Sequence, residues 1–180
     1  MRVTDPADGG VSPASTFVRV VLVTWQATGL PSGLTLSSTG TLTGTPSAGS
    51  GSAAGTSYTA SVTVRDANGA TDASEVQLKV FTPPAITAPT IPNATESKAL
   101  TSFTYTATGA PTLTWSATGL PTWATINAST GAVAGTPTSG SGSSNPTSYS
   151  FTVTVTDANG ATATTGTQTL KVYKAPAITV

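Results

Sequence analysis

The chain has 180 residues, balances seven basic against seven acidic side chains, and has neither histidine nor cysteine. The lack of these two residue types excludes Ser-His-Asp and Cys-His catalysis and zinc sites built on imidazole or thiolate. The basic residues are scattered and no apolar run approaches the roughly 20 residues of a membrane helix, so we also expect no nucleic-acid binding and no membrane insertion.

Two copies of one unit, each of about 90 residues, follow each other along the chain, and this is the size of a small β-sandwich. The segment Thr-Trp-Gln-Ala-Thr-Gly-Leu-Pro at 24–31 recurs at 114–121 with a single change. Asp-Ala-Asn-Gly-Ala-Thr at 66–71 returns unchanged at 157–162, and Leu-Lys-Val at 78–80 returns at 170–172. We therefore predict two domains, residues 1–84 and residues 85–180.

The first residues, 1–6, contain no apolar stretch of the kind that a secretion signal needs. Residues 17–23 lack the Gly-Ala-Pro turn found at 109–111 in the second copy, so the opening strand of the first copy is expected to be shortened or missing. The next strand carries Trp25 toward the core. After a Gly/Ser-rich stretch at 47–55, interpreted as a flexible loop, residues 58–64 alternate apolar and polar side chains, which predicts a half-buried strand.

Asp66 and Asp157 each precede an Ala-Asn-Gly sequence that predicts a tight β-turn. The favoured interpretation is that each carboxylate caps its turn. The oxygen-rich loops also make Asp66 and Asp157 weak candidates for calcium, but Ca²⁺ takes 6–8 oxygen ligands and each loop offers one carboxylate. Two isolated turn aspartates do not form a catalytic carboxylate pair, so we expect no enzyme and no cofactor.

Residues 81–87 join the copies, and two prolines in this segment predict end-to-end domains with limited bending. The second copy then shows a strand at 103–107 and a strand with Trp115 inward. A second Gly/Ser-rich loop lies at 138–144, and an alternating strand follows at 149–155. No stretch has a helical period with caps. The predicted fold class is all-β, with two tandem immunoglobulin-like β-sandwich domains.

The chain ends in Ala-Pro-Ala-Ile-Thr-Val at 175–180, which repeats the Pro-Ala-Ile-Thr that opens the second copy at 84–87. One interpretation is that the chain is a fragment of a longer array of repeats. The other is that Ile178, Thr179 and Val180 fill the gap in the first domain of another subunit by strand addition.

The repeated blocks resemble the immunoglobulin-like and cadherin-like tandem repeats of bacterial, archaeal and phage surface proteins. The residues that carry this resemblance are Trp25 with Gly-Leu-Pro-Ser-Gly-Leu-Thr-Leu at 29–36, Gly-Thr-Pro at 44–46 and Val-Thr-Val-Arg-Asp-Ala-Asn-Gly at 62–69, with their second-copy counterparts. The resemblance implies a modular spacer or adhesive unit on a cell or virion surface, with neighbouring repeats or further copies as partners.

The predicted function is a structural, non-catalytic module of a stalk, filament or virion appendage. The alternative is an adhesin or carbohydrate-binding module, in which Trp123 or the loops would bind a cell-surface glycan. Trp123 stands where the first copy has Gly33. Relatives with Leu-Pro-x-Trp pack this ring against the sandwich, so the resemblance favours burial of Trp123 over glycan stacking.

Overall fold

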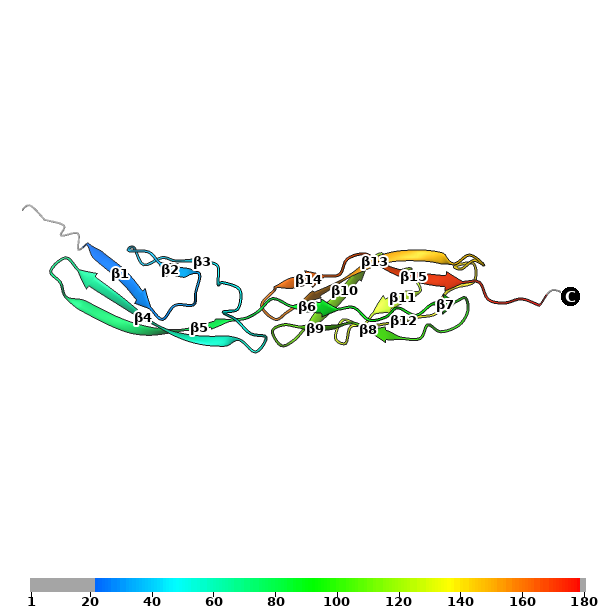
Figure 1. Ribbon diagram of the computed structural model, residues 1–180, viewed down its shortest axis with the longest axis horizontal. Helices are drawn as coiled ribbons and strands as arrows, with labels where there is room; N and C mark the ends of the chain where they lie inside the picture. Colours follow the sequence, from blue (N-terminus) through cyan, green and yellow to red (C-terminus); the bar gives the residue numbers. More distant parts are fainter. Residues whose placement is uncertain (1–21, 179–180) are drawn as a thin grey trace, which may run out of the picture.

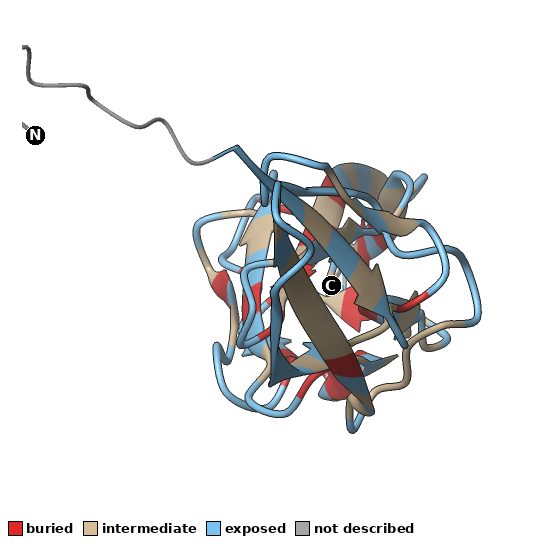
Figure 2. Cartoon of the chain, turned by 90° about the vertical axis from the view of Figure 1, so that its left-hand side faces the viewer, coloured by how far each residue is buried: buried red, intermediate tan, exposed pale blue. Residues whose placement is uncertain are grey.

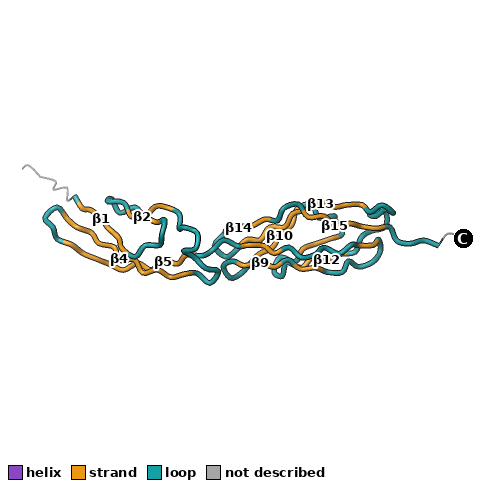
Figure 3. The backbone as a smooth tube through the Cα atoms, in the orientation of Figure 1, coloured by secondary structure: helices purple, strands orange, loops and turns teal. Residues whose placement is uncertain are grey.

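The computed structural model describes residues 22–178 and shows two β-sheet repeats placed end to end along one axis (Figure 1). Every regular element of this part of the chain is a strand (Figure 3). Accordingly, none of the described residues forms a helix that could cross a membrane. The all-β fold class predicted from the sequence is confirmed.

The first repeat is built from two antiparallel sheets. A long sheet has the order β1-β4-β5, and β2 pairs with β3 in a separate hairpin. The strands are β1 (Val23–Thr28), β2 (Leu34–Leu36), β3 (Leu42–Gly44), β4 (Thr56–Asp66) and β5 (Thr71–Val80). The opening strand that we expected to be shortened or missing falls in residues 1–21, outside the described residues.

The second repeat has more strands. One sheet has the order β10-β13-β15-β7 with β14 also paired to β13, a second has the order β11-β12-β8, and β6 pairs with β9. Its strands are β6 (Ala85–Thr87), β7 (Ala94–Thr95), β8 (Phe103–Thr104), β9 (Thr106–Thr108), β10 (Thr114–Thr118), β11 (Ala124–Ile126), β12 (Ala132–Gly135), β13 (Thr147–Thr156), β14 (Thr162–Thr164) and β15 (Gln168–Tyr173).

Alternation along β13 explains why this sequence forms a half-buried strand. Phe151, Val153 and Val155 point inward and are almost fully buried, while the Thr side chains between them face outward. The outward hydroxyls pair across strands, as Thr154 does with Thr164 at 2.9 Å. Such cross-strand pairs each contribute roughly 0.2–1 kcal/mol, so the threonine-rich face is stabilised without charge.

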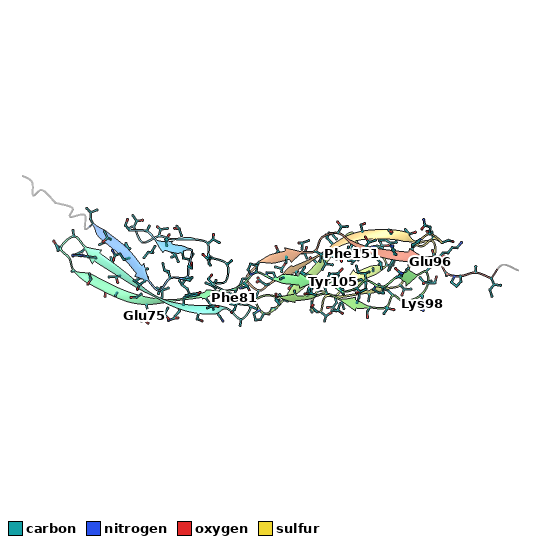
Figure 4. All side chains as sticks on the ribbon, viewed as in Figure 1. Glu75, Phe81, Glu96, Lys98, Tyr105 and Phe151 are labelled. Carbon is teal, nitrogen blue, oxygen red and sulfur yellow. The ribbon has the colours of Figure 1, made fainter. Side chains whose placement is uncertain are left out.

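The core of the second repeat is closed over an aromatic cluster. Tyr105 packs on Phe103 with ring centroids 6.1 Å apart and on Trp115 at 6.4 Å. Val133, Val153 and Leu170 below them are fully buried. Figure 4 shows Tyr105 and Phe151 within this repeat, Phe81 at the junction, and Glu96 at the far end.

The strand predicted at 103–107 is divided in the structure. β8 pairs with β12 and β9 pairs with β6, so the chain changes sheets at Tyr105. At this change the Tyr105 backbone N–H donates to the Gly131 carbonyl at 3.1 Å. A uniform alternation of apolar and polar residues does not reveal such a switch, because both halves keep the same inward face.

Candidate functional site

The linker between the repeats is held on both sides. On the side of the first repeat, Phe81 forms a parallel bridge with Ser52, and the Thr82 N–H donates to the Ser52 carbonyl at 3.1 Å. On the other side, Pro84 is buried and lies against Gly109, where an added Cβ would come within 3.0 Å of the Pro84 Cβ. The four residues 81–84 separate β5 from β6. Phe81, Thr82 and Pro84 are held by the contacts just described.

An open cavity of about 380 Å³ lies where the two repeats meet. Leu34, Pro46 and the end of β5 line it from the first repeat, and the turn at 157–161 lines it from the second. The Lys79 Nζ stands 5.2 Å from the centre of the Phe81 ring at this junction, a cation–π distance. In the described part of the chain, the linker and the turn at 157–161 thus meet around an open cavity that Leu34 and Pro46 also line.

The two candidate calcium ligands are engaged in their own turns. Asp66 Oδ1 accepts the N–H groups of Asn68 and Ala70, both at 2.9 Å. Asp157 Oδ1 accepts the equivalent N–H groups of Asn159 and Ala161 at 2.9 and 3.0 Å. Among residues 22–178 no cluster of three or more Asp, Glu, His or Cys side chains could hold a metal ion. In this geometry each carboxylate caps its own turn.

Trp123 is half-buried on the second repeat. Its ring meets Tyr149 edge-on, with centroids 6.0 Å apart and planes at 87°. The indole Nε1–H is buried and has no hydrogen-bond partner. An open cavity of about 430 Å³ lies beside the ring and includes the loop at 138–141. Trp123 thus packs against Tyr149 and also lines an open cavity.

The equivalent tryptophans Trp25 and Trp115 have different surroundings. Trp115 is 5% exposed beneath Tyr105, whereas Trp25 is only half-buried and lines an open apolar groove of about 220 Å³. Leu42 and Val76 on this groove remain 44% and 42% exposed. Viewed from the end of the first repeat, its strands are mostly exposed or intermediate in burial (Figure 2). The groove is lined by Trp25, Ala27, Leu30, Leu36, Gly40, Leu42, Ala60, Val62, Val76 and Leu78.

The segment after β15 is held to the second repeat by the same backbone contacts that hold the linker to the first repeat. Tyr173 forms a parallel bridge with Ser143, and the Lys174 N–H donates to the Ser143 carbonyl at 3.1 Å. The chain then runs out beyond the repeat, at the end opposite the first repeat (Figure 1). Ile178 is 94% exposed there. Of the three residues predicted for self-association, Thr179 and Val180 lie outside the described residues.

Sequence reasoning missed the role of the two Gly/Ser-rich stretches. We predicted flexible loops, but both stretches carry the same hydrogen bonds: Tyr58 donates to the Ser50 carbonyl at 2.7 Å, and Tyr149 donates to the Ser141 carbonyl at 2.8 Å. Gly51 and Gly142 lie against Phe81 and Tyr173 so closely that a side chain would meet backbone. The sequence contained evidence for this role, because Gly51 and Gly142 occupy equivalent positions in the two copies.

Tyr105 is the group whose titration the fold alters most clearly. Its side chain is 1% exposed and its hydroxyl has no hydrogen-bond partner. Burial raises the pKa of this hydroxyl from 10.0 to about 12, because the phenolate would lose its hydration. This tyrosine is part of the core of the second repeat.

Solved structures to which the chain shows a distant likeness include cadherin repeats. Drosophila N-cadherin EC1-3 is 15% identical, covering 86% of this chain and 56% of that one with a TM-score of 0.38. Mouse cadherin-23 EC22-24 is 15% identical, covering 86% and 54% with a TM-score of 0.39. A Bacteroides fragilis protein described as a "putative alpha-galactosidase" is 22% identical, with 52% of this chain and 18% of that protein covered and a TM-score of 0.39. The chain thus spans well under two thirds of each.

No curated protein matches the chain. The family model described as "Putative Ig domain" matches residues 3–81 and, a second time, residues 83–173. The two matches together cover nearly the whole sequence, and they fall on the two repeats that the internal self-similarity defines. Immunoglobulin-like families of this kind are generally non-catalytic and typically extracellular. The chain therefore belongs to the Putative Ig domain family, as two consecutive immunoglobulin-like domains.

Proposed function

We propose that this protein is a non-catalytic structural module that holds its two ends apart, as a subunit of a stalk, filament or virion appendage. The observation that carries the proposal is the linker, which is anchored to Ser52 in the first repeat and buried at Pro84 in the second. A segment held on both sides transmits orientation from one repeat to the next. The repeat units are residues 1–84 and 85–180, joined within this segment.

The surface of the chain supports a spacing role. Only 8% of the residues are charged, and the outer faces of the strands carry threonine hydroxyls that pair across strands, such as Thr118 with Thr152 at 2.8 Å. Paired hydroxyls keep the face hydrated while they restrain the strands. Such a surface suits a module outside the cell, on a cell or virion surface, with neighbouring repeats or further copies as its partners.

Glycan binding through Trp123 is the alternative function, and it has less support. The ring is half-buried and packs edge-on against Tyr149, so part of its surface is already used for packing. The open cavity beside it is the one observation in its favour. Titration with soluble glycans, followed by tryptophan fluorescence, separates the two: a saturable change that is lost in Trp123→Phe would establish the alternative, and no change would leave the spacing role.

Small-angle X-ray scattering of the monomeric chain tests the spacing role. An end-to-end pair with a held linker gives a distance distribution with a long tail, and its largest dimension stays constant with temperature and salt. The Ile178→Asp variant is suited to this measurement, because Ile178 is 94% exposed and a charge there should oppose association through the tail. A distribution as short as that of two repeats folded side by side would overturn the proposal.

A further inference from the structure

The last residues of β15 lie between β7 and a loop, at the end of the second repeat that is remote from the linker (Figure 1). On one side, Tyr173 pairs in parallel with Thr95, and the Tyr173 carbonyl accepts the Glu96 N–H at 3.0 Å. On the other side, Tyr173 forms a parallel bridge with Ser143, whose carbonyl accepts the Lys174 N–H at 3.1 Å. The chain therefore leaves the repeat between two partners that both bind its backbone.

The side chain of Glu96 connects these two partners to each other. Its Oε1 atom accepts the backbone N–H of Gly142, the residue before Ser143, at 2.7 Å. Glu96 lies at the far end of the repeat (Figure 4) and is only 7% exposed, so this bond is largely shielded from water. One residue thus binds both sides of the exit. We call the residues that close this ring, Glu96, Gly142, Ser143, Tyr173 and Lys174, the exit clasp.

The neighbouring backbone fixes the exit clasp in place. A Cβ added to Gly142 would come within 2.6 Å of the Tyr173 carbonyl oxygen, so this close approach requires glycine. Directly after Glu96, Ser97 has φ 55°, which is uncommon for a residue other than glycine. The Ser97 N–H donates to the Pro137 carbonyl at 2.9 Å and so ties this turn to the chain before the loop.

A carboxylate is an unfavourable choice for this position if it serves stability alone. Burial of a charged group opposes folding, and apolar side chains of similar volume can replace buried ion pairs without loss of stability. A hydrogen bond to a charged group is, however, roughly twice as strong as one between neutral groups. Glu96 is therefore suited to a contact that has to resist being pulled apart.

The direction of the strands decides how the exit clasp responds to tension along the molecule. β7 and β15 are parallel, so the chain enters β7 from the side of the linker and leaves β15 on the opposite side (Figure 1). Between the linker and β7 the load passes β6, which pairs with β9. Tension between the two ends of the repeat draws β7 and β15 in opposite directions along their axes. The bonds of the clasp are then stretched together, whereas a sideways pull breaks them one at a time.

We propose that the exit clasp makes the second repeat resistant to tension, so that the protein holds two attached bodies together under load as well as apart. This inference rests on the proposed structural role and deepens it, because a subunit that spaces two bodies also transmits the forces that act on them. Glu96 gives the clasp its strength, since it bonds to β15 through its backbone and to Gly142 through its side chain. Unfolding under tension begins at the clasp, and the core opens afterwards.

Stretching single molecules in two directions tests the proposal on an unchanged clasp. The chain has no cysteine, so pairs of introduced cysteines set the points of attachment. Thr90→Cys with Ala177→Cys, both at exposed positions, stretches β7 and β15 along their axes. Lys98→Cys with Ala177→Cys pulls the same strands apart at one end of the repeat (Figure 4). At the same loading rate, the first pair should unfold at a clearly higher force than the second. Equal forces in the two directions would overturn the proposal.

Substitution of Glu96 tests its part in the clasp. Glu96→Ala removes the bond to Gly142, so the unfolding rate at constant force along the strands should rise by about 10- to 100-fold. Glu96→Gln is the matched variant, because its amide oxygen can accept the same N–H, and its rate should lie between those of Glu96→Ala and the unchanged chain.

A core variant separates strength under tension from overall stability. Val155 is fully buried on β13, where its register partners are Trp115 and Ala163 and not a residue of β15. Val155→Ala should therefore lower the stability in urea and change the unfolding rate under force only slightly. Rates under force that follow the urea stabilities of both variants alike would contradict the role of Glu96.

The comparison of the two pulling directions decides the matter even if Glu96→Ala does not fold. The result is also separable from the spacing role, which X-ray scattering tests without applied force. A chain of constant largest dimension that gives equal forces in both directions keeps the spacing role and lacks the resistance to tension.

Discussion

The rings of Tyr105 and Trp115 pack together with their centroids 6.4 Å apart, and the Tyr105 hydroxyl is buried without a hydrogen-bond partner. An unpaired buried hydroxyl costs roughly 1–3 kcal/mol. We therefore expect Tyr105→Phe to raise the free energy of unfolding of the second repeat by about 1 kcal/mol, as measured by urea denaturation. A loss of stability in this variant would mean that the hydroxyl has a partner in solution.

The same residue predicts a specific response to alkaline pH. The pKa of Tyr105 is about 12 in the folded chain and 10.0 ordinarily, so between these values the unfolded chain has lost a proton that the folded chain keeps. The contribution of Tyr105 to stability is fully present below pH 10 and falls by about 1.4 kcal/mol per pH unit up to pH 12. Unfolding followed at several pH values in the unchanged chain and in Tyr105→Phe isolates this contribution; parallel curves from pH 9 to 12 would contradict it.

Substitution of the two turn aspartates should lower the stability of the protein by different amounts. Asp157 is 5% exposed and accepts two backbone N–H groups, and Asp66 makes the same bonds in a more exposed place. Asp157→Ala should lower the free energy of unfolding by roughly 1–3 kcal/mol, and Asp66→Ala should lower it by less.

Asp157→Asn is the matched control, since the amide oxygen can still accept both bonds and should retain most of the stability. Addition of Ca²⁺ should leave all of these melting temperatures unchanged. A rise in the melting temperature of the unchanged chain that Asp157→Asn abolishes would show that the turn binds calcium.

Removal of the two linker prolines should loosen the relative orientation of the repeats. Replacing Pro83 and Pro84 with glycine frees two φ angles and takes away the contact of Pro84 with Gly109. We expect the largest dimension measured by X-ray scattering to shorten and to become dependent on temperature, while the melting temperature of each repeat changes little. An unaltered scattering profile would mean that the turn at 157–161, and not the linker, sets the angle.

Much of the fold could be predicted because the repeat unit occurs twice in the sequence. The return of Asp-Ala-Asn-Gly-Ala-Thr and of Leu-Lys-Val defines the repeat, and the alternation of Phe151, Val153 and Val155 defines a buried face. The change of sheet at Tyr105 could not be predicted, because it depends on the backbone bond to Gly131 and leaves the alternation intact.

The candidate sites were harder to predict than the fold. The sequence identified Asp66 and Asp157 as turn residues, and the structure shows the bonds of those turns. It did not reveal the open groove, because Leu42 and Val76 look like ordinary core residues in the sequence but are 44% and 42% exposed in the structure. The match between residues 84–87 and the tail was visible, whereas the identical exit geometry needed coordinates.

The proposed structural role requires that the two repeats keep a fixed orientation to each other, and a distance measurement between two spin labels checks this requirement. The chain has no cysteine, so Ser57→Cys and Ser148→Cys place single labels at exposed, equivalent positions on β4 and β13. Measurement on the Ile178→Asp background keeps each molecule separate. We expect one narrow distance distribution, which broadens when Pro83 and Pro84 are replaced by glycine. A broad distribution in the chain with both prolines would contradict it.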